Sequence, residues 1–130
     1  LREAAAELTE RATGSLATGT LRDVIGLAGT VTTVAALAMD LPAYDSETIH
    51  GARISTDDAT RIAEELARMP LSARRELAVM HPGRADVIVS GAAILATILT
   101  SVGADSFVAS EHDILDGIAW SLLDQPNMTQ

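Results

Sequence analysis

The spacing of apolar positions divides the chain into helices and short strands. An apolar, β-branched run at 23–27 predicts a strand, and the alanine- and threonine-rich run 31–39 predicts the helix that follows it. Apolar residues at helical spacing predict the other helices, and a second short apolar run predicts a second strand. These helices cover 1–13, 55–69, 72–80, 84–104 and 114–123, and the second strand covers 105–109.

The connection between the first strand and its helix is the most informative stretch. Gly29 would let the backbone approach a ligand, and the free N–H groups of the helix start, with the hydroxyls of Thr30, Thr32 and Thr33, would point at it. Such a helix start favours phosphate. The spacing alone is more typical of a plain helix start, because neither a Walker loop nor a dinucleotide-binding fingerprint is present.

The most hydrophobic stretch, 87–104, carries no charged residue over a length that approaches a membrane span. Asp86 and Asp105 bracket it, small and hydroxyl residues interrupt it, and no aromatic or basic residues flank it. These features favour a buried core helix over a membrane helix. Ser110 and Asp113 match a capping box that would begin the last helix.

Composition limits the size and the core. Hydrophobic residues make up 48% of the 130 positions, yet only Tyr44, Phe107 and Trp120 are aromatic, so the core must consist of Ala, Val, Leu and Ile. Such a core suits closely packed helices. Residues 1–130 are expected to form a single partial domain: two predicted strands are too few for a stable sheet, so further strands should lie upstream in a longer protein. No signal peptide pattern opens the sequence.

Charge and cysteine content exclude several classes of function. The net charge of −9, with nine arginines and no lysine, argues against nucleic-acid or anionic-membrane binding. Without cysteine there are no disulfides, thiolate zinc sites or cysteine nucleophiles, which is compatible with a cytoplasmic protein. The three histidines lack metal-site spacing, and no serine-nucleophile elbow occurs. We therefore predict no catalytic residue and no metal ligand. From the residues alone, the chain is an acidic, alanine-rich α/β fragment.

Four sequence blocks resemble a known family. In chain order they are VIGLAGTVTTVAAL, IHG, HPGRADVIVSGAAIL and SEHDILDGIAW. Together they are similar to the C-terminal part of the exopolyphosphatase/guanosine pentaphosphate phosphohydrolase (Ppx/GppA phosphatase) family, especially its actinobacterial members. The resemblance implies a helix-rich α/β fold: a partial second ribonuclease-H-like domain of the actin-like ATPase superfamily, lacking its N-terminal strands.

The resemblance also implies roles for individual residues. Gly29 and Thr30 correspond to the family's Gly-Gly-Thr phosphate loop, in which Ala28 replaces the first glycine. Alanine is acceptable there if only Gly29 needs unusual dihedral angles. Gly91 and Ala92 correspond to a small-residue helix segment that packs where two domains hinge. Candidate polyanion contacts are the arginines Arg61, Arg74, Arg75 and Arg84, although pairing with surface acids explains them equally well.

The family's chemistry is attack of an activated water on a terminal phosphoryl group. The resemblance implies that Mg²⁺ and the catalytic base are held by the N-terminal half, which this sequence lacks, so the 130 residues alone should hydrolyse nothing. The substrate would be inorganic polyphosphate or guanosine pentaphosphate, and a homodimer is compatible with the apolar faces. Two alternatives stay open: an ATP-dependent sugar-kinase-like or chaperone-like relative, and a non-enzymatic helical interaction or dimerisation module.

Overall fold

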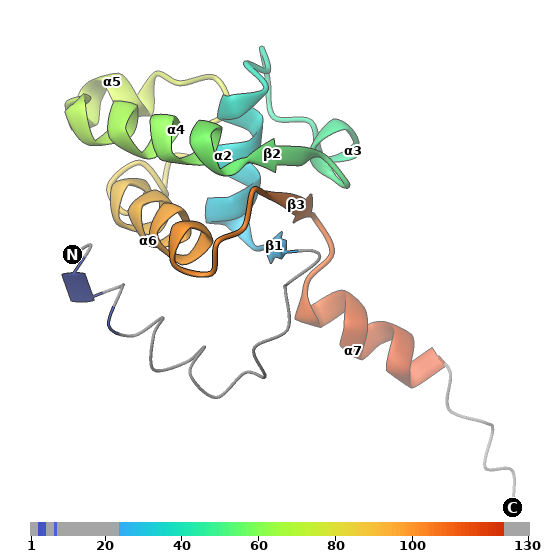
Figure 1. The fold of residues 1–130 in the computed structure, drawn as a ribbon. Helices are drawn as coiled ribbons and strands as arrows, with labels where there is room; N and C mark the ends of the chain where they lie inside the picture. Colours follow the sequence, from blue (N-terminus) through green and yellow to red (C-terminus); the bar gives the residue numbers. More distant parts are fainter. Residues whose placement is uncertain (1–2, 5–6, 8–23, 124–130) are drawn as a thin grey trace, which may run out of the picture.

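The computed structural model describes residues 3, 4, 7 and 24–123, so the predicted helix at 1–13 lies almost entirely outside the described residues (Figure 1). The described chain alternates short strands with helices. In order these are β1 (Ile25–Leu27), α2 (Gly29–Ala38), α3 (Ser46–Ile49), β2 (Arg53–Ser55), α4 (Thr56–Arg68), α5 (Leu71–Arg75), α6 (Ile88–Ser101), β3 (Ser106–Ser110) and α7 (Ile114–Leu123).

A small mixed sheet has the strand order β1-β3-β2. β3 pairs in parallel with β1, with Val108 opposite Ile25, and antiparallel with β2, with Phe107 opposite Ile54. The two predicted strands are confirmed, but the expectation of only two within the chain is wrong. β2 was missed because its three residues are too few to show an alternating pattern.

The core lies between the sheet and the helices α2, α4 and α6, with α2 contacting both the strands and the other two helices (Figure 1). Ala35 and Ala36 of α2 are completely buried, and their small side chains let the neighbouring helices approach closely. The largest fully buried side chains are those of Phe107, Ile49, Leu66, Ile88, Leu99, Val34 and Thr33. Apart from Phe107 and Met80, the buried hydrophobic side chains among the described residues are those of alanine, valine, leucine and isoleucine, as the composition predicted.

Three predicted helix ends were wrong, and local hydrogen bonds explain two of them. α6 begins at Ile88 because the backbone of 84–87 forms a turn, in which the N–H groups of Val87 and Ile88 both donate to the Arg84 carbonyl, at 3.1 and 2.9 Å. α5 ends at Arg75 because the next N–H, that of Glu76, bonds only three residues back. α2 begins at Gly29, so the Gly-Thr pair lies in its first turn.

Of the two predicted helix caps, the one at α4 is confirmed and the one at α7 is wrong. Ser55 caps α4, as predicted, by accepting a hydrogen bond from the Asp58 N–H at 3.0 Å. The predicted box at Ser110 is wrong: the box begins three residues later, where Asp113 accepts from the Leu115 N–H and Asp116 accepts from the Asp113 N–H. Asp45 caps the short helix α3, which lay in a predicted loop.

α7 projects away from the rest of the fold (Figure 1) and has no buried residue. Six large apolar side chains on it are exposed: Ile114, Leu115, Ile118, Trp120, Leu122 and Leu123. A helix that is apolar on all sides normally packs against other protein. Among the described residues, no helix is both long enough and apolar enough to cross a membrane, and the stretch predicted as a core helix contains the 14-residue α6.

Candidate functional site

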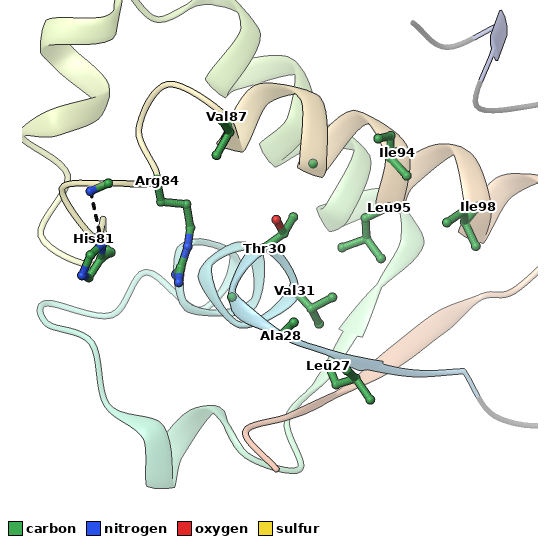
Figure 2. Close-up of a pocket in the computed structure, with 13 residues that line it drawn as sticks. Leu27, Ala28, Thr30, Val31, His81, Arg84, Val87, Ile94, Leu95 and Ile98 are labelled. Carbon is green, nitrogen blue, oxygen red and sulfur yellow. Dashed lines mark hydrogen bonds between the residues drawn. The ribbon is translucent and has the colours of Figure 1, made fainter. Parts of the chain in front are cut away.

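A pocket of about 600 Å³ opens between the start of α2, the turn before α6 and one side of α6 (Figure 2). The residues that line it come from these three segments. They are Leu27, Ala28, Gly29, Thr30, Val31, His81, Gly83, Arg84, Val87, Gly91, Ile94, Leu95 and Ile98. The structure therefore brings together Gly29, Thr30, Arg84 and Gly91, which the sequence analysis named as candidates on separate segments.

The N-terminus of α2 supplies polar backbone groups to this pocket. The Ala28 carbonyl accepts from the N–H groups of Val31 and Thr32, at 3.0 and 3.3 Å, which leaves those of Gly29 and Thr30 as the first-turn donors. Among the described residues no side chain caps α2, and its first turn contains no acidic residue. The positive end of the helix dipole is therefore available to an anion.

Ala28, just before the helix, has an unusual backbone conformation, with φ 71° and ψ 165°. This region of dihedral space is populated almost only by glycine, and a side chain there costs roughly 1–3 kcal/mol. Alanine was expected to be acceptable here on the condition that only Gly29 needs unusual dihedral angles. That condition is not met, because the positive φ falls on Ala28 itself.

Ala28→Gly is therefore expected to stabilise the protein by about 1 kcal/mol, since relief of strain outweighs the extra freedom of glycine in the unfolded chain. Denaturant unfolding of the full-length protein measures the change. The matched control is Ala36→Gly on the same helix, where the backbone is helical and the methyl group is buried, so that variant should be destabilised. A loss of stability in Ala28→Gly would contradict the account.

Arg84 places a cation over the start of the helix (Figure 2). Its Nη1 donates a hydrogen bond to Thr33 Oγ1 at 2.6 Å. A Cβ added to Gly29 would lie 2.1 Å from Arg84 Nη2 and 2.4 Å from Cζ, so the guanidinium occupies the space that a side chain would need. Within the described part of the chain, no carboxylate forms an ion pair with Arg84. An arginine without an acidic partner and a bare helix N-terminus at one pocket favour binding of an oxyanion.

Gly91 of α6 lies directly against Thr30 of α2 at this pocket. A Cβ at Gly91 would lie 2.6 Å from Thr30 Oγ1 and 2.8 Å from Thr30 Cγ2. The neighbouring Ala92 is buried in the core. Small residues here let α6 close one side of the phosphate-loop candidate, and their role at a domain hinge stays a prediction.

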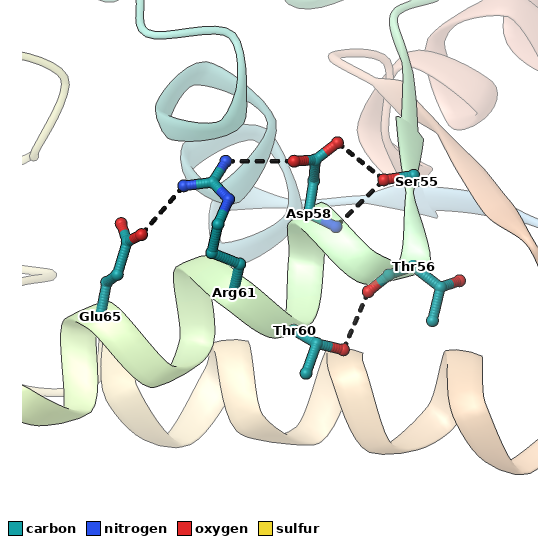
Figure 3. A network of polar contacts seen from close by, with 6 residues as sticks. All are labelled: Ser55, Thr56, Asp58, Thr60, Arg61 and Glu65. Carbon is teal, nitrogen blue, oxygen red and sulfur yellow. Dashed lines mark hydrogen bonds and ion pairs between the residues drawn. The ribbon is translucent and has the colours of Figure 1, made fainter.

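The structure separates the candidate arginines. Arg61 lies on the surface of α4, where it pairs with Asp58 at 3.1 Å and Glu65 at 3.0 Å (Figure 3). Arg74 lies on α5 with its Nε buried and without a hydrogen-bond partner among the described residues. Neither these two nor Arg75 lines the pocket that contains Arg84. Arg84 is therefore the candidate that the geometry favours.

The contacts around Arg61 lead to a prediction about the pKa of Asp58 (Figure 3). The hydrogen bond from Ser55, and next the Arg61 guanidinium, lower the pKa of Asp58 from its ordinary value of 3.8. Because the folded-state pKa is lowered, this stabilisation is present above pH 3.8 and is lost as the pH falls through the folded-state value. NMR titration should show that Ser55→Ala raises the pKa of Asp58, whereas Thr60→Val, one turn along α4, should leave it unchanged. Equal pKa values in Ser55→Ala and the wild type would contradict this.

Two threonines differ from the sequence-based expectation. Thr32 and Thr33 were expected to point their hydroxyls at a ligand, but they are 2% and 0% exposed. Thr33 Oγ1 bonds instead to the Gly29 carbonyl at 2.7 Å, and Thr32 Oγ1 lies 2.7 Å from the Tyr44 hydroxyl. Both side chains therefore support the loop from inside the protein.

Tyr44 was missed by the sequence analysis. Its hydroxyl hydrogen-bonds with Thr32 and with Glu111 Oε1, both at 2.7 Å, and so joins α2 to the segment after β3. Burial raises the pKa of Tyr44 above its ordinary value of 10.0, and the Glu111 carboxylate raises it further. No sequence signal could have found this contact, because Tyr44 and Glu111 are 67 positions apart.

The pocket does not fit a magnesium ion. The lining residues that the structure describes include no carboxylate, the ligand type that Mg²⁺ prefers. Across the residues that the structure describes, no group of three histidine, aspartate or glutamate side chains could hold a metal. In the described part of the chain, the hydrogen-bond donors of the pocket therefore have no metal site beside them.

The sequence of the chain is similar to those of known phosphatases. The chain matches the sequence model of the Ppx/GppA phosphatase family over residues 1–125. It is 46% identical over 105 residues to exopolyphosphatase 2 of Mycobacterium tuberculosis, covering 78% of this chain and 33% of that protein. It is 35% identical over 95 residues to a bifunctional 3-dehydroquinate synthase/phosphatase of Fusobacterium nucleatum, covering 72% of this chain and 14% of that protein. The chain thus spans a third or less of the length of these curated relatives.

Solved structures agree with the sequence comparison. A crystal structure of an exopolyphosphatase-like protein superposes with a TM-score of 0.85 at 37% identity, covering 93% of this chain and 42% of that one. The Aquifex aeolicus family member gives a TM-score of 0.83 at 23% identity over 98% of this chain and 42% of that one, which shows the shared fold. The expected helix-rich α/β architecture, a partial domain of the actin-like ATPase fold, is confirmed. By sequence and by fold, the chain belongs to the Ppx/GppA phosphatase family.

Proposed function

We propose that this chain is the C-terminal region of an exopolyphosphatase or guanosine pentaphosphate phosphohydrolase, in which it forms one wall of the substrate cleft. The observation that carries the proposal is the pocket at the start of α2, where Arg84 and the N–H groups of Gly29 and Thr30 meet. The 46% identity to an exopolyphosphatase supports this choice of substrate class.

The pocket groups would bind and orient a phosphate rather than transfer protons. The helix N–H groups and the guanidinium are hydrogen-bond donors, and they would stabilise negative charge on the phosphoryl oxygens as water attacks. Among the described residues that line the pocket there is no carboxylate to act as a general base. The base would therefore come from the part of the protein outside this sequence, as would the carboxylates for Mg²⁺, which would supply further charge stabilisation when bound.

Because the chain has a net charge of −9, its attraction for a phosphate must come from a small positive region and not from the surface as a whole. A polyanion would be repelled by most of this surface, so the favourable interaction concentrates where Arg84 is free of acidic partners among the described residues. This distribution suits capture of one terminal phosphate group better than binding of a long chain along the surface.

A phosphate-release assay on the full-length protein with magnesium tests the proposal. Long-chain polyphosphate, guanosine pentaphosphate and ATP should be compared, with release expected from polyphosphate or the guanosine nucleotide. The isolated 130 residues should release nothing from any of them. Release from ATP alone would favour the kinase-like or chaperone-like alternative, and no release from the other two substrates would reject the proposal.

The exposed apolar surface of α7 favours a second candidate, a helical interaction or dimerisation module. Its six exposed apolar side chains would be covered by another part of the same protein or by a second copy. This alternative predicts concentration-dependent association of the full-length protein without a phosphate ligand. Analytical ultracentrifugation with and without polyphosphate, together with the release assay, distinguishes the two candidates.

A further inference from the structure

Thr33 has a buried hydroxyl that connects the start of α2 to Arg84, on the turn before α6. Its side chain is 0% exposed. Thr33 Oγ1 donates to the Gly29 carbonyl at 2.7 Å, and it accepts from Arg84 Nη1 at 2.6 Å. It therefore contacts the phosphate-loop candidate and the candidate cation at once, from the side opposite the solvent.

The chemistry of a hydroxyl fixes the direction of these two bonds. A threonine has one proton to donate, and the Gly29 carbonyl takes it. The oxygen lone pairs then face Arg84, so the guanidinium is held where a Cβ on Gly29 would otherwise lie. Valine has the same shape but neither the proton nor the lone pairs, whereas serine keeps both.

The bond to the Gly29 carbonyl alone does not explain this arrangement. Other helical threonines make the same bond to the carbonyl four residues back: Thr60 at 2.8 Å, Thr97 at 2.7 Å and Thr100 at 2.8 Å. Among the described residues none of those hydroxyls has an arginine partner. What distinguishes Thr33 is that its second bond goes to the pocket's arginine.

We propose that Thr33 is a positioning residue that holds Arg84 over the N-terminus of α2 and so sets the affinity of this pocket for a terminal phosphate group. The inference rests on the proposed function. Without the bond to Thr33, the Arg84 side chain would sample other rotamers. It would then bind an anion less tightly, because binding would have to order the side chain and so lose conformational entropy.

The test is calorimetric titration of the full-length protein with tripolyphosphate, without magnesium so that no hydrolysis occurs. Thr33→Val should bind about tenfold more weakly, as loss of a hydrogen bond to a charged group implies. Thr33→Ser should retain near wild-type affinity. Arg84→Gln should also bind weakly, and Thr33→Val combined with Arg84→Gln should bind no more weakly than Arg84→Gln alone, because Thr33 acts through Arg84.

Thr97→Val is the matched control, since it removes a back-bonded hydroxyl from α6 outside the pocket. Its affinity should equal that of the wild type. If Thr33→Val fails to fold, as judged by circular dichroism, Thr33→Ala compared with Thr33→Ser gives the same contrast. If only the shape of the Thr33 side chain mattered, valine would retain the affinity and serine, which lacks the methyl group, would reduce it.

The outcomes separate the inference from the proposed function. If the wild type does not bind tripolyphosphate, the proposed function fails and the inference fails with it. If Arg84→Gln weakens binding but Thr33→Val does not, or if the two losses add fully, the inference alone is overturned. Weak binding by Thr33→Val, rescue by Thr33→Ser and no added loss in the double variant would support it.

Discussion

Gly29→Ala in the full-length protein should lower phosphate release about a hundredfold, the effect of losing one or two hydrogen bonds to a charged group. The added Cβ would lie 2.1 Å from Arg84 Nη2, so the guanidinium must leave its place over the helix start. Displacing the guanidinium breaks its hydrogen bond to Thr33, but the displaced atoms are the end of a flexible side chain and alanine is favoured over glycine in this helical turn by about 1 kcal/mol, so the two effects largely offset each other. Release assays and thermal unfolding on the same preparation should show activity lost and Tm nearly unchanged.

Arg84→Gln should reproduce the loss, and combining it with Gly29→Ala should add little. The control is Gly117→Ala on α7, where an added Cβ meets nothing within 4 Å. That variant should keep both activity and stability. Wild-type release by Gly29→Ala would mean that the position of the guanidinium is irrelevant to the reaction.

Gly91→Ala should destabilise the protein by about 1–3 kcal/mol, the usual cost of overpacking a close contact. Its Cβ would lie 2.6 Å from Thr30 Oγ1 and 3.2 Å from Thr30 Cβ. Thr30 is β-branched and in the first turn of α2, so relief requires a shift of the helix itself rather than a side-chain rotation. Denaturant unfolding measures the loss, and phosphate release should fall with it because Thr30 lines the pocket.

Thr30→Ala tests the mechanism of that loss, since it removes the two atoms nearest the added methyl group. Gly91→Ala together with Thr30→Ala should recover most of the stability relative to Thr30→Ala alone. Should Gly91→Ala be as stable as the wild type, α6 and α2 would not be in the close contact described here.

Local signals explain which parts of the fold could be predicted from the sequence. The strand and helix around the Gly-Thr pair follow from apolar runs a few residues long, and the Ser55 cap depends on an acceptor three positions from its donor. β2 could not be predicted, because three residues gain strand geometry only by pairing with the distant β3. The long helix was placed too early because apolar content does not reveal the turn at Arg84.

In the site, too, features with a local sequence signal could be predicted, and features that depend on distant contacts could not. A local pattern and a family resemblance named Gly29 and Thr30 as candidates, and both line the pocket. The choice among the arginines was beyond the sequence, because Arg84 is defined by a hydrogen bond to Thr33 across 51 positions, whereas Arg61 finds its acidic partners within four. The strain at Ala28 was also hidden, since a dihedral angle is set by the packing of β1 and α2 together.

The most direct test of the account is an NMR titration of the ¹⁵N-labelled full-length protein with tripolyphosphate. The account predicts that the largest shifts fall on the backbone amides of Gly29 and Thr30 and on the Arg84 side chain, and that Arg84→Gln abolishes them. Saturable binding that shifts surface arginines such as Arg61 while leaving these amides unmoved would contradict it.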